Sequence, residues 1–277
     1  MQVATMPMIA KTVSLGAGLD LEYVERGSRG RVPVVFLHGV TDSWGSFEGL
    51  LSRLPECTHA FALSQRGHGN SSRPRSGYRI SDLANDLTLF LNALEIERAV
   101  LVGHSMGSFV AQRFAIDRPS RTAGLALLGS ATGMHDNDAL WGFWRSTVAT
   151  LTDPVDPEIA REFQLSTLSR PTAPGLVDAF VLESLKVPAR IWREAFAGFL
   201  ELDHRAELGR IAAPTLIANG DSDAMFTPEH QRALHDAIPG STLLIYPGGG
   251  HAAHWEDPAR VTADLTAFFD TCKEFQS

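Results

Sequence analysis

Short apolar runs alternate along this chain with longer segments of helical periodicity. Four-residue runs without a polar interruption, such as Val34–Leu37 and Ala99–Val102, are typical of strands covered on both faces of a sheet. Further strands are predicted, in chain order, at Thr12–Leu15, Leu21–Glu25, His59–Leu63, Gly124–Leu128, Thr215–Ala218 and Thr242–Ile245. The first two of these are joined by Gly16-Ala17-Gly18, which indicates an opening hairpin.

Segments of helical periodicity lie between these strands. One helix is expected from Asp42 or Ser43, either of which can cap it, to about Arg53. Another is expected to begin at Ser81, and a closing helix at Pro258, each with its apolar residues on one face. Because strands and helices alternate, we predict an α/β fold with a mainly parallel, doubly wound sheet.

The segment 131–210 breaks this alternation, since it has helical patterns and no convincing strand. One predicted helix face carries Trp141, Trp144, Val148 and Leu151, and another carries Trp192, Phe196 and Phe199. The segment lies between two strands of the sheet, so we expect a helical lid over the carboxyl ends of the strands, where ligands bind in such folds. The chain then divides into a first core part (1–130), the lid (131–210) and a second core part (211–277).

Trp141 and Trp144 are the lid residues that we expect to contact substrate. An aromatic stripe on a helix more often reflects packing than ligand contact, so packing is the alternative for both side chains.

Composition narrows the class of protein. The chain has 277 residues, 44% hydrophobic and 20% charged, which is ordinary for a globular domain. A net charge of −8 without Lys/Arg runs argues against nucleic acid or a membrane surface as partner. No apolar window approaches the roughly 20 residues of a membrane span, and no signal peptide pattern is present. We expect a cytoplasmic protein with Cys57 and Cys272 as free thiols, no metal and no cofactor.

The sequence Gly103-His104-Ser105-Met106-Gly107 joins the strand Ala99–Val102 to a predicted helix over Ser108–Ala115. A G-x-S-x-G between a strand and a helix is the signature of a nucleophile elbow, a tight turn that exposes the serine hydroxyl. The backbone N–H of Met106 then faces negative charge that forms beside the serine. The alternative is an ordinary turn whose glycines serve only close packing.

Acidic and histidine candidates follow two later strands. Asp221 and Asp223 come after Thr215–Ala218, and His251 and His254 come after Thr242–Ile245. A serine hydroxyl needs a neighbouring base to act as a nucleophile, and a carboxylate holds an imidazole in the useful tautomer. The chain order serine, aspartate, histidine is the order of the hydrolases with a nucleophile elbow.

These motifs resemble those of the α/β-hydrolase fold superfamily over nearly the whole chain. The matching stretches, in family order, are His38-Gly39, Arg66-Gly67-His68-Gly69-Asn70-Ser71, the elbow, Gly220-x-x-Asp223 and Gly250-His251. The resemblance implies a triad of Ser105, Asp223 and His251. It leaves Asp221 to cap its own turn, and it makes His254 a packed or hydrogen-bonded histidine.

The resemblance also implies an oxyanion hole formed by the backbone N–H groups of Val40 and Met106. It places His104 facing into the sheet and His38 bracing the loop that carries Val40. The family usually has aspartate where this chain has Ser64, so comparison of that loop is weaker.

A serine in the elbow excludes the dehalogenases and epoxide hydrolases of this superfamily, which carry aspartate there. We predict a serine hydrolase that cleaves a carboxylic ester of a small to medium apolar or aromatic substrate through an acyl-serine intermediate. A lactonase, a perhydrolase or a carbon–carbon bond hydrolase would use the same residues. The alternative of a different class is a ligand sensor with slow turnover. The sequence does not indicate an oligomeric state.

Overall fold

The computed structural model describes residues 8–29 and 32–272. Eight strands form one sheet in the order β1-β2-β4-β3-β5-β6-β7-β8. In chain order they are β1 (Ala10–Ser14), β2 (Asp20–Arg26), β3 (Val34–Leu37), β4 (Ala60–Leu63), β5 (Ala99–His104), β6 (Thr122–Leu128), β7 (Thr215–Gly220) and β8 (Thr242–Tyr246). The pairs β1–β2 and β2–β4 are antiparallel and the other pairs are parallel. The predicted mainly parallel α/β sheet is confirmed.

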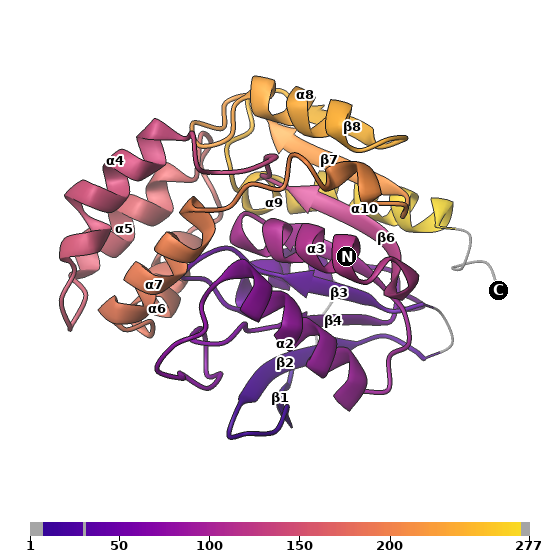
Figure 1. Cartoon of the computed structure of the whole chain (residues 1–277), viewed down its shortest axis with the longest axis horizontal. Helices are drawn as coiled ribbons and strands as arrows, with labels where there is room; N and C mark the ends of the chain where they lie inside the picture. The colour runs from indigo at the N-terminus through magenta and orange to yellow at the C-terminus, as the bar shows by residue number, and fades with distance from the viewer. Residues whose placement is uncertain (1–7, 30–31, 273–277) are drawn as a thin grey trace.

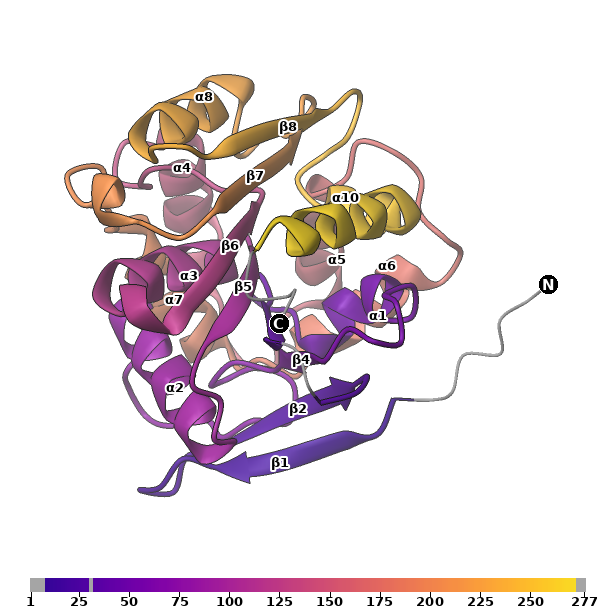
Figure 2. The same ribbon diagram turned by 90° about the vertical axis from the view of Figure 1, so that its right-hand side faces the viewer.

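Helices cover both faces of the sheet (Figures 1 and 2). One face carries α2 (Ile80–Ala93) and α3 (Met106–Asp117), and the other carries α1 (Glu48–Leu51) and α10 (Pro258–Thr271). The remaining helices of this part of the chain are α8 (Pro228–Ala237), α9 (Ala253–Glu256) and the 3-10 turns η1 (Trp44–Phe47), η2 (Pro119–Arg121) and η4 (Leu208–Arg210). No helix among the described residues is long and apolar enough to cross a membrane.

Adjacent residues of the central strands belong to two different cores. In β3, Val35 and Leu37 pack in the core beneath α2 and α3, whereas Val34 and Phe36 pack in the core beneath α1 and α10. Side chains alternate between the faces of a strand, so a strand covered on both faces needs apolar residues at every position. The four-residue apolar runs in the sequence follow from this packing.

The helix expected from residue 42 or 43 to 53 is shorter and less regular than predicted. Ser43 caps the 3-10 turn η1, where its Oγ accepts a hydrogen bond from the N–H of Gly45 at 3.2 Å. Only the four residues of α1 then form an α-helix. Ser43 therefore acts as the predicted cap, but of a 3-10 turn that bends the chain into a short helix.

Four helices and a 3-10 turn lie between β6 and η4, and η4 in turn precedes β7. They are α4 (Asp138–Ser146), η3 (Val148–Thr150), α5 (Pro157–Ser166), α6 (Leu176–Leu185) and α7 (Ala189–Leu200). Figure 1 shows the helices grouped together at one end of the sheet. On α7, Trp192, Phe196 and Phe199 are all buried, as predicted. The other predicted face is wrong in part, because α4 ends at Ser146 and Val148 lies in the following 3-10 turn.

Close backbone packing surrounds the turn between β5 and α3. A Cβ atom on Gly107 would overlap with the carbonyl of Leu37 at the end of β3 and would lie 2.7 Å from the carbonyl oxygen of His38. A Cβ atom on Gly103 would overlap with the backbone of Gly107 itself. Both positions exclude a side chain because backbone atoms cannot move aside cheaply.

The substitution Gly107→Ala is expected to lower the free energy of unfolding by about 2 to 3 kcal/mol or more, because it forces β3 away from α3. Gly142→Ala in α4 is the matched control: its Cβ would meet open space, so helix propensity predicts a gain of up to about 1 kcal/mol. Urea denaturation of the two variants measures both effects. A Gly107→Ala protein as stable as the wild type would contradict the packing.

Candidate active site

Ser105 sits at the turn from β5 into α3 with φ 51° and ψ −122°. Positive φ is unfavourable for a residue with a side chain and costs on the order of 1 to 3 kcal/mol. Neighbouring hydrogen bonds hold the conformation: the N–H of Ser105 donates to the carbonyl of Leu128 at 3.0 Å, and the Ser108 hydroxyl donates to the carbonyl of Ser105 at 2.6 Å. A strained serine at a strand end is the geometry expected of the G-x-S-x-G motif.

His251 and Asp223 form a buried hydrogen-bonded pair. His251 follows β8 and Asp223 follows β7, and the His251 Nδ1 lies 2.8 Å from Asp223 Oδ2. The other carboxylate oxygen accepts the N–H groups of Met225 at 2.7 Å and Phe226 at 2.9 Å. Because one ring nitrogen donates to the carboxylate, the other, Nε2, is left as an acceptor; it is buried and has no hydrogen-bond partner among the described residues.

Electrostatics keep Asp223 ionised. Burial by itself raises the pKa of this carboxyl, but the electrostatic interaction and hydrogen bond with His251 and the two backbone N–H groups outweigh it, so the pKa lies below its ordinary value. Asp221 is exposed and lies apart from this pair: its Oδ1 accepts the N–H of Gly248 at 2.6 Å. Of the two candidate aspartates, the structure therefore places Asp223 against His251.

A small pocket brings Ser105 and His251 to one surface. Its walls come from the loop after β3, the turn before α3, helix α5 and the region of α9, and the lining residues are Gly39, Val40, Asp42, His104, Ser105, Phe163, Gln164, Thr167, His251 and Trp255. Val40 thus lies beside the serine, and Met106 is the first residue of α3, whose leading N–H groups have no partner within the helix. Val40 and Ser105 therefore line the same pocket, and Met106 directly follows Ser105 in the chain.

Trp141 and Trp144 do not line this pocket. They pack edge to face against each other with ring centroids 6.0 Å apart, and the Trp141 indole N–H donates to the carbonyl of His135. The insertion reaches the pocket instead through Phe163 and Gln164 of α5 and through Thr167, which caps the end of that helix. Phe163 and Thr167 are four residues apart, the spacing of one helix face, but nothing in the sequence distinguishes that face from the several others in the insertion.

The other histidines near Ser105 are neutral. Burial lowers the pKa of His254 to about 3 and lowers the pKa of His38 and His104 well below the ordinary value. His104 donates from Nε2 to the carbonyl of His251 at 3.3 Å, and His254 Nε2 lies 3.3 Å from the hydroxyl of Ser46. These rings pack and position the backbone around His251.

His38 links two loops next to the pocket. Its Nδ1 donates to the carbonyl of Gly39 at 2.7 Å, and its Nε2 accepts the N–H of Gln65 at 2.9 Å. The loop containing Gln65 also carries Ser64, where the resemblance leads to an expectation of aspartate. The Ser64 hydroxyl donates to Glu22 on β2 at 2.9 Å, and Glu22 also accepts from Asn70. A carboxylate thus reaches this loop from another strand.

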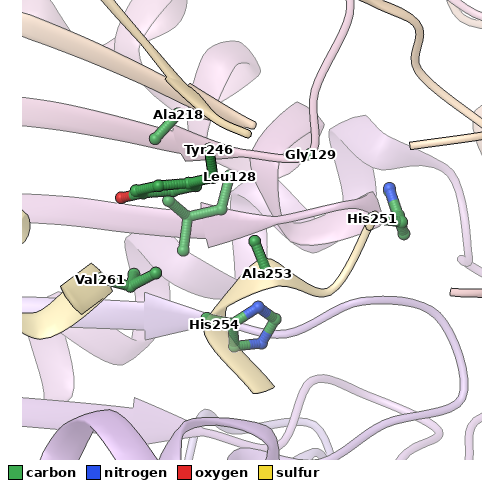
Figure 3. Close-up of a pocket in the computed structure, with 8 residues that line it drawn as sticks. All are labelled: Leu128, Gly129, Ala218, Tyr246, His251, Ala253, His254 and Val261. Atoms are coloured by element: carbon green, nitrogen blue, oxygen red, sulfur yellow. The ribbon is translucent and has the colours of Figure 1, made fainter. Parts of the chain in front are cut away.

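A second small cavity lies on the other side of His251. Figure 3 shows His251 at one end of this cavity and Tyr246 and Val261 at the other. Its wall is completed by Leu128, Gly129, Ala218, Ala253 and His254. A side chain at Gly129, where φ is +54°, would approach the His251 ring to 2.9 Å, so the glycine allows the imidazole its position.

Asp42 is an acidic group for which the sequence predicts only a role as a possible helix cap. It is 3% exposed and lines the pocket of Ser105. Burial raises its pKa from 3.8 to about 7, against the opposing effects of a hydrogen bond from Gln164 and the electrostatic interaction with His251. The sequence does place Asp42 three residues after His38-Gly39 and hence near the expected oxyanion loop. Its burial, however, depends on contacts with α5, which the sequence does not reveal.

No group of three or more histidine, cysteine, aspartate or glutamate side chains within residues 8–29 and 32–272 is arranged to hold a metal ion. Cys57 is exposed and Cys272 is buried, and neither is in a disulfide.

Comparison with known proteins identifies the family. The family profile of the alpha/beta hydrolase fold matches residues 32–258, and the chain belongs to this family. A non-heme chloroperoxidase of Streptomyces lividans is 29% identical over 93% of this chain and 98% of its own. Among solved structures, an esterase from Exiguobacterium antarcticum has a TM-score of 0.85 at 22% identity, covering 95% of this chain and all of its own.

An enol-lactonase from Burkholderia xenovorans has the same fold, with a TM-score of 0.80 at 21% identity over 93% of this chain and 99% of its own. The relatives thus share the fold while their names describe different reactions.

The raised pKa of Asp42 predicts a pH-dependent cost to stability. The unfolded chain releases this proton near pH 3.8 and the folded chain only near pH 7, so the cost grows across that range and is complete above it. Asp42→Asn has no proton to lose, so its stability advantage over the wild type is expected to grow by about 2 kcal/mol between pH 5 and pH 8. Chemical denaturation at the two pH values measures it.

Asp236→Asn, at an exposed position of α8, is the control and is expected to show no such growth. An Asp42→Asn advantage that is the same at both pH values would contradict a raised pKa.

Proposed function

We propose that this protein is a serine hydrolase that cleaves carboxylic esters of small to medium apolar or aromatic substrates through an acyl-serine intermediate. The observation that carries the proposal is the arrangement of three residues. A strained Ser105 and a His251 whose Nε2 has no protein partner line one pocket, while Asp223 occupies the opposite nitrogen of the same imidazole. This is the division of roles in a Ser-His-Asp triad.

Each step of the reaction uses one of these groups. His251 Nε2 takes the proton of the Ser105 hydroxyl as Oγ attacks the ester carbonyl carbon. The oxygen of the tetrahedral intermediate accepts hydrogen bonds from the N–H groups of Val40 and Met106. The carbon–oxygen bond to the alcohol breaks, and His251 passes its proton to the departing oxygen. A water molecule, activated by the same imidazole, then releases the acid from the serine.

The negative charge of Asp223 stabilises the charge that His251 acquires in this reaction. His251 becomes positively charged in both tetrahedral intermediates, and a carboxylate held ionised beside Nδ1 stabilises that charge. The pocket walls beside the serine include Phe163 and Trp255, which suit an apolar or aromatic part of the substrate.

We further propose that the insertion 131–210 acts as a lid over the carboxyl ends of the strands. Its helix α5 supplies Phe163 and Gln164 to the pocket that contains Ser105, and the C-cap residue of that helix supplies Thr167. Excluding water there strengthens the hydrogen bonds to the developing oxyanion.

Ser105→Ala is expected to lower kcat for p-nitrophenyl butyrate by at least about a thousandfold, because removal of a triad nucleophile leaves only the oxyanion hole and binding. Wild type treated with a p-nitrophenyl phosphonate should gain one covalent adduct, located at Ser105 by peptide mass spectrometry. A kcat of Ser105→Ala within tenfold of the wild-type value, or an adduct on another residue, would contradict the mechanism.

Asp223→Asn and Asp221→Asn form a matched pair of the same chemistry in the same loop. We expect Asp223→Asn to reduce kcat by a factor on the order of ten thousand, because the amide no longer favours the useful histidine tautomer. Asp221→Asn is expected to stay within about threefold of the wild type, since this exposed side chain accepts hydrogen bonds from the N–H of Gly248 and the hydroxyl of Ser222 and does not contact His251. Steady-state kinetics of both variants, with circular dichroism to confirm folding, test whether Asp223 is the triad carboxylate. An equal decrease of kcat in the two variants would contradict this role.

A further inference from the structure

A cluster of four buried polar side chains joins the loop after β3 to the helical insertion. Gln164 on α5 donates from Nε2 to Asp42 Oδ1 at 3.1 Å and to the hydroxyl of Ser184 on α6 at 2.9 Å. Ser184 in turn donates to the hydroxyl of Thr41 at 3.1 Å. These contacts fix one oxygen of the Asp42 carboxyl and the orientation of its plane.

The second oxygen of Asp42 faces the reaction pocket. Within the described part of the chain, no hydrogen bond reaches Oδ2. A methyl group placed on Gly39 would lie 3.1 Å from both Asp42 Oδ2 and His104 Nδ1 and 3.3 Å from the Cβ of Ser105, so these three groups flank the same small volume. The pocket contains both residues. A carboxyl oxygen without a protein partner, beside the serine, is an acceptor for a ligand.

Two features at Thr41 and Asp42 are unfavourable for the stability of the folded protein. Asp42 is buried at 3% exposure, although a carboxyl in such surroundings disfavours its charged form. The preceding residue, Thr41, has a positive φ of 69°, a region that a β-branched residue seldom adopts. Strain and a buried ionisable group beside a pocket are typical of a functional position.

We propose that Asp42 is a specificity-determining residue, whose Oδ2 accepts a hydrogen bond from a hydroxyl group that the substrate carries next to its scissile carbonyl. This inference rests on the proposed ester hydrolysis at Ser105. A hydroxyl fits better than an ammonium group, because His251 becomes positively charged in the reaction and would repel a second cation in the same pocket. A substrate without the hydroxyl leaves this carboxyl oxygen unpaired in the closed pocket, which lowers binding and rate.

The test compares two esters that differ only in this hydroxyl. Methyl mandelate, as separate enantiomers, and methyl phenylacetate are hydrolysed by the full-length protein, and acid release is followed by pH-stat. We expect kcat/KM for the preferred mandelate enantiomer to exceed that for phenylacetate by about tenfold to a hundredfold. This is the factor that corresponds to the free energy of one hydrogen bond to a charged acceptor. Equal values, no turnover of mandelate, or a stronger preference for methyl phenylglycinate would overturn the proposal.

Asp42→Asn tests the residue itself. The asparagine oxygen still accepts from Gln164, while its amide turns a donor toward the pocket in place of an acceptor. The mandelate preference is expected to fall at least tenfold. If Asp42 only connected α5 to the loop after β3, the preference would survive this substitution. Glu183→Gln is the control, because it removes the other nearby negative charge, which lies on α6 and pairs with Lys186, and it should keep the preference.

A pH profile of the preference gives a second readout. The charged or titratable groups that face Asp42 are His251 from the loop after β8, Glu183 from α6 and the neutral His104 from β5. Because titration of His251 affects both esters alike, it cancels in the ratio of their kcat/KM values. The ratio is expected to rise from pH 6 to pH 8 as Asp42 becomes a carboxylate and to stay flat in Asp42→Asn; a flat wild-type ratio would contradict the assignment.

Failure of this inference and failure of the proposed function give different results. If Ser105 is not the nucleophile, Ser105→Ala retains activity on both esters. If only the role of Asp42 is wrong, activity depends on Ser105 but the mandelate preference is absent or is unaffected by Asp42→Asn.

Discussion

The backbone strain at Ser105 can persist only because the structure on both sides of the turn is rigid. The turn is enclosed by the end of β3, by β6 through the bond from Ser105 to Leu128, and by the first turn of α3. Glycine at 103 and 107 is what lets these backbones approach so closely. A strained residue survives when its surroundings determine its conformation completely, so the two packed cores on either face of the sheet are what keep the serine hydroxyl in place.

Burial, together with the hydrogen bonds each group receives, determines which ionisable groups around that hydroxyl are charged and which are neutral. Asp223 stays ionised because His251 and two backbone N–H groups compensate for the loss of water. His104 and His254 have no comparable partner and become neutral packing groups. Asp42 is intermediate, with one polar partner on α5 and one oxygen toward the pocket. The same low-dielectric interior thus produces three outcomes, according to how many hydrogen bonds each group receives.

The helical insertion shows where sequence patterns stop being informative. Its aromatic residues predict two helix faces, of which α7 buries one as a whole while α4 ends before it includes Val148. Trp141 and Trp144, however, pack their rings against each other. The pocket wall comes instead from α5, through one apolar residue, Phe163, and one polar residue, Gln164. Hydrophobic periodicity reports which side of a helix avoids water. It does not distinguish a neighbouring helix from a ligand as the partner, because both are apolar surfaces.

The sequence by itself determined the order of strands and helices, the mainly parallel sheet and the position of Ser105 at a strand–helix turn, because periodicity and glycine spacing are local properties. It also placed Asp223 and His251 after strands that end at one edge of the sheet, although their catalytic roles stay predictions. Only the tertiary structure decided which α5 residues face the serine and that Asp42 is buried beside it with a raised pKa. Those features depend on how the insertion docks onto the loop after β3, and docking is set by contacts between residues more than a hundred positions apart.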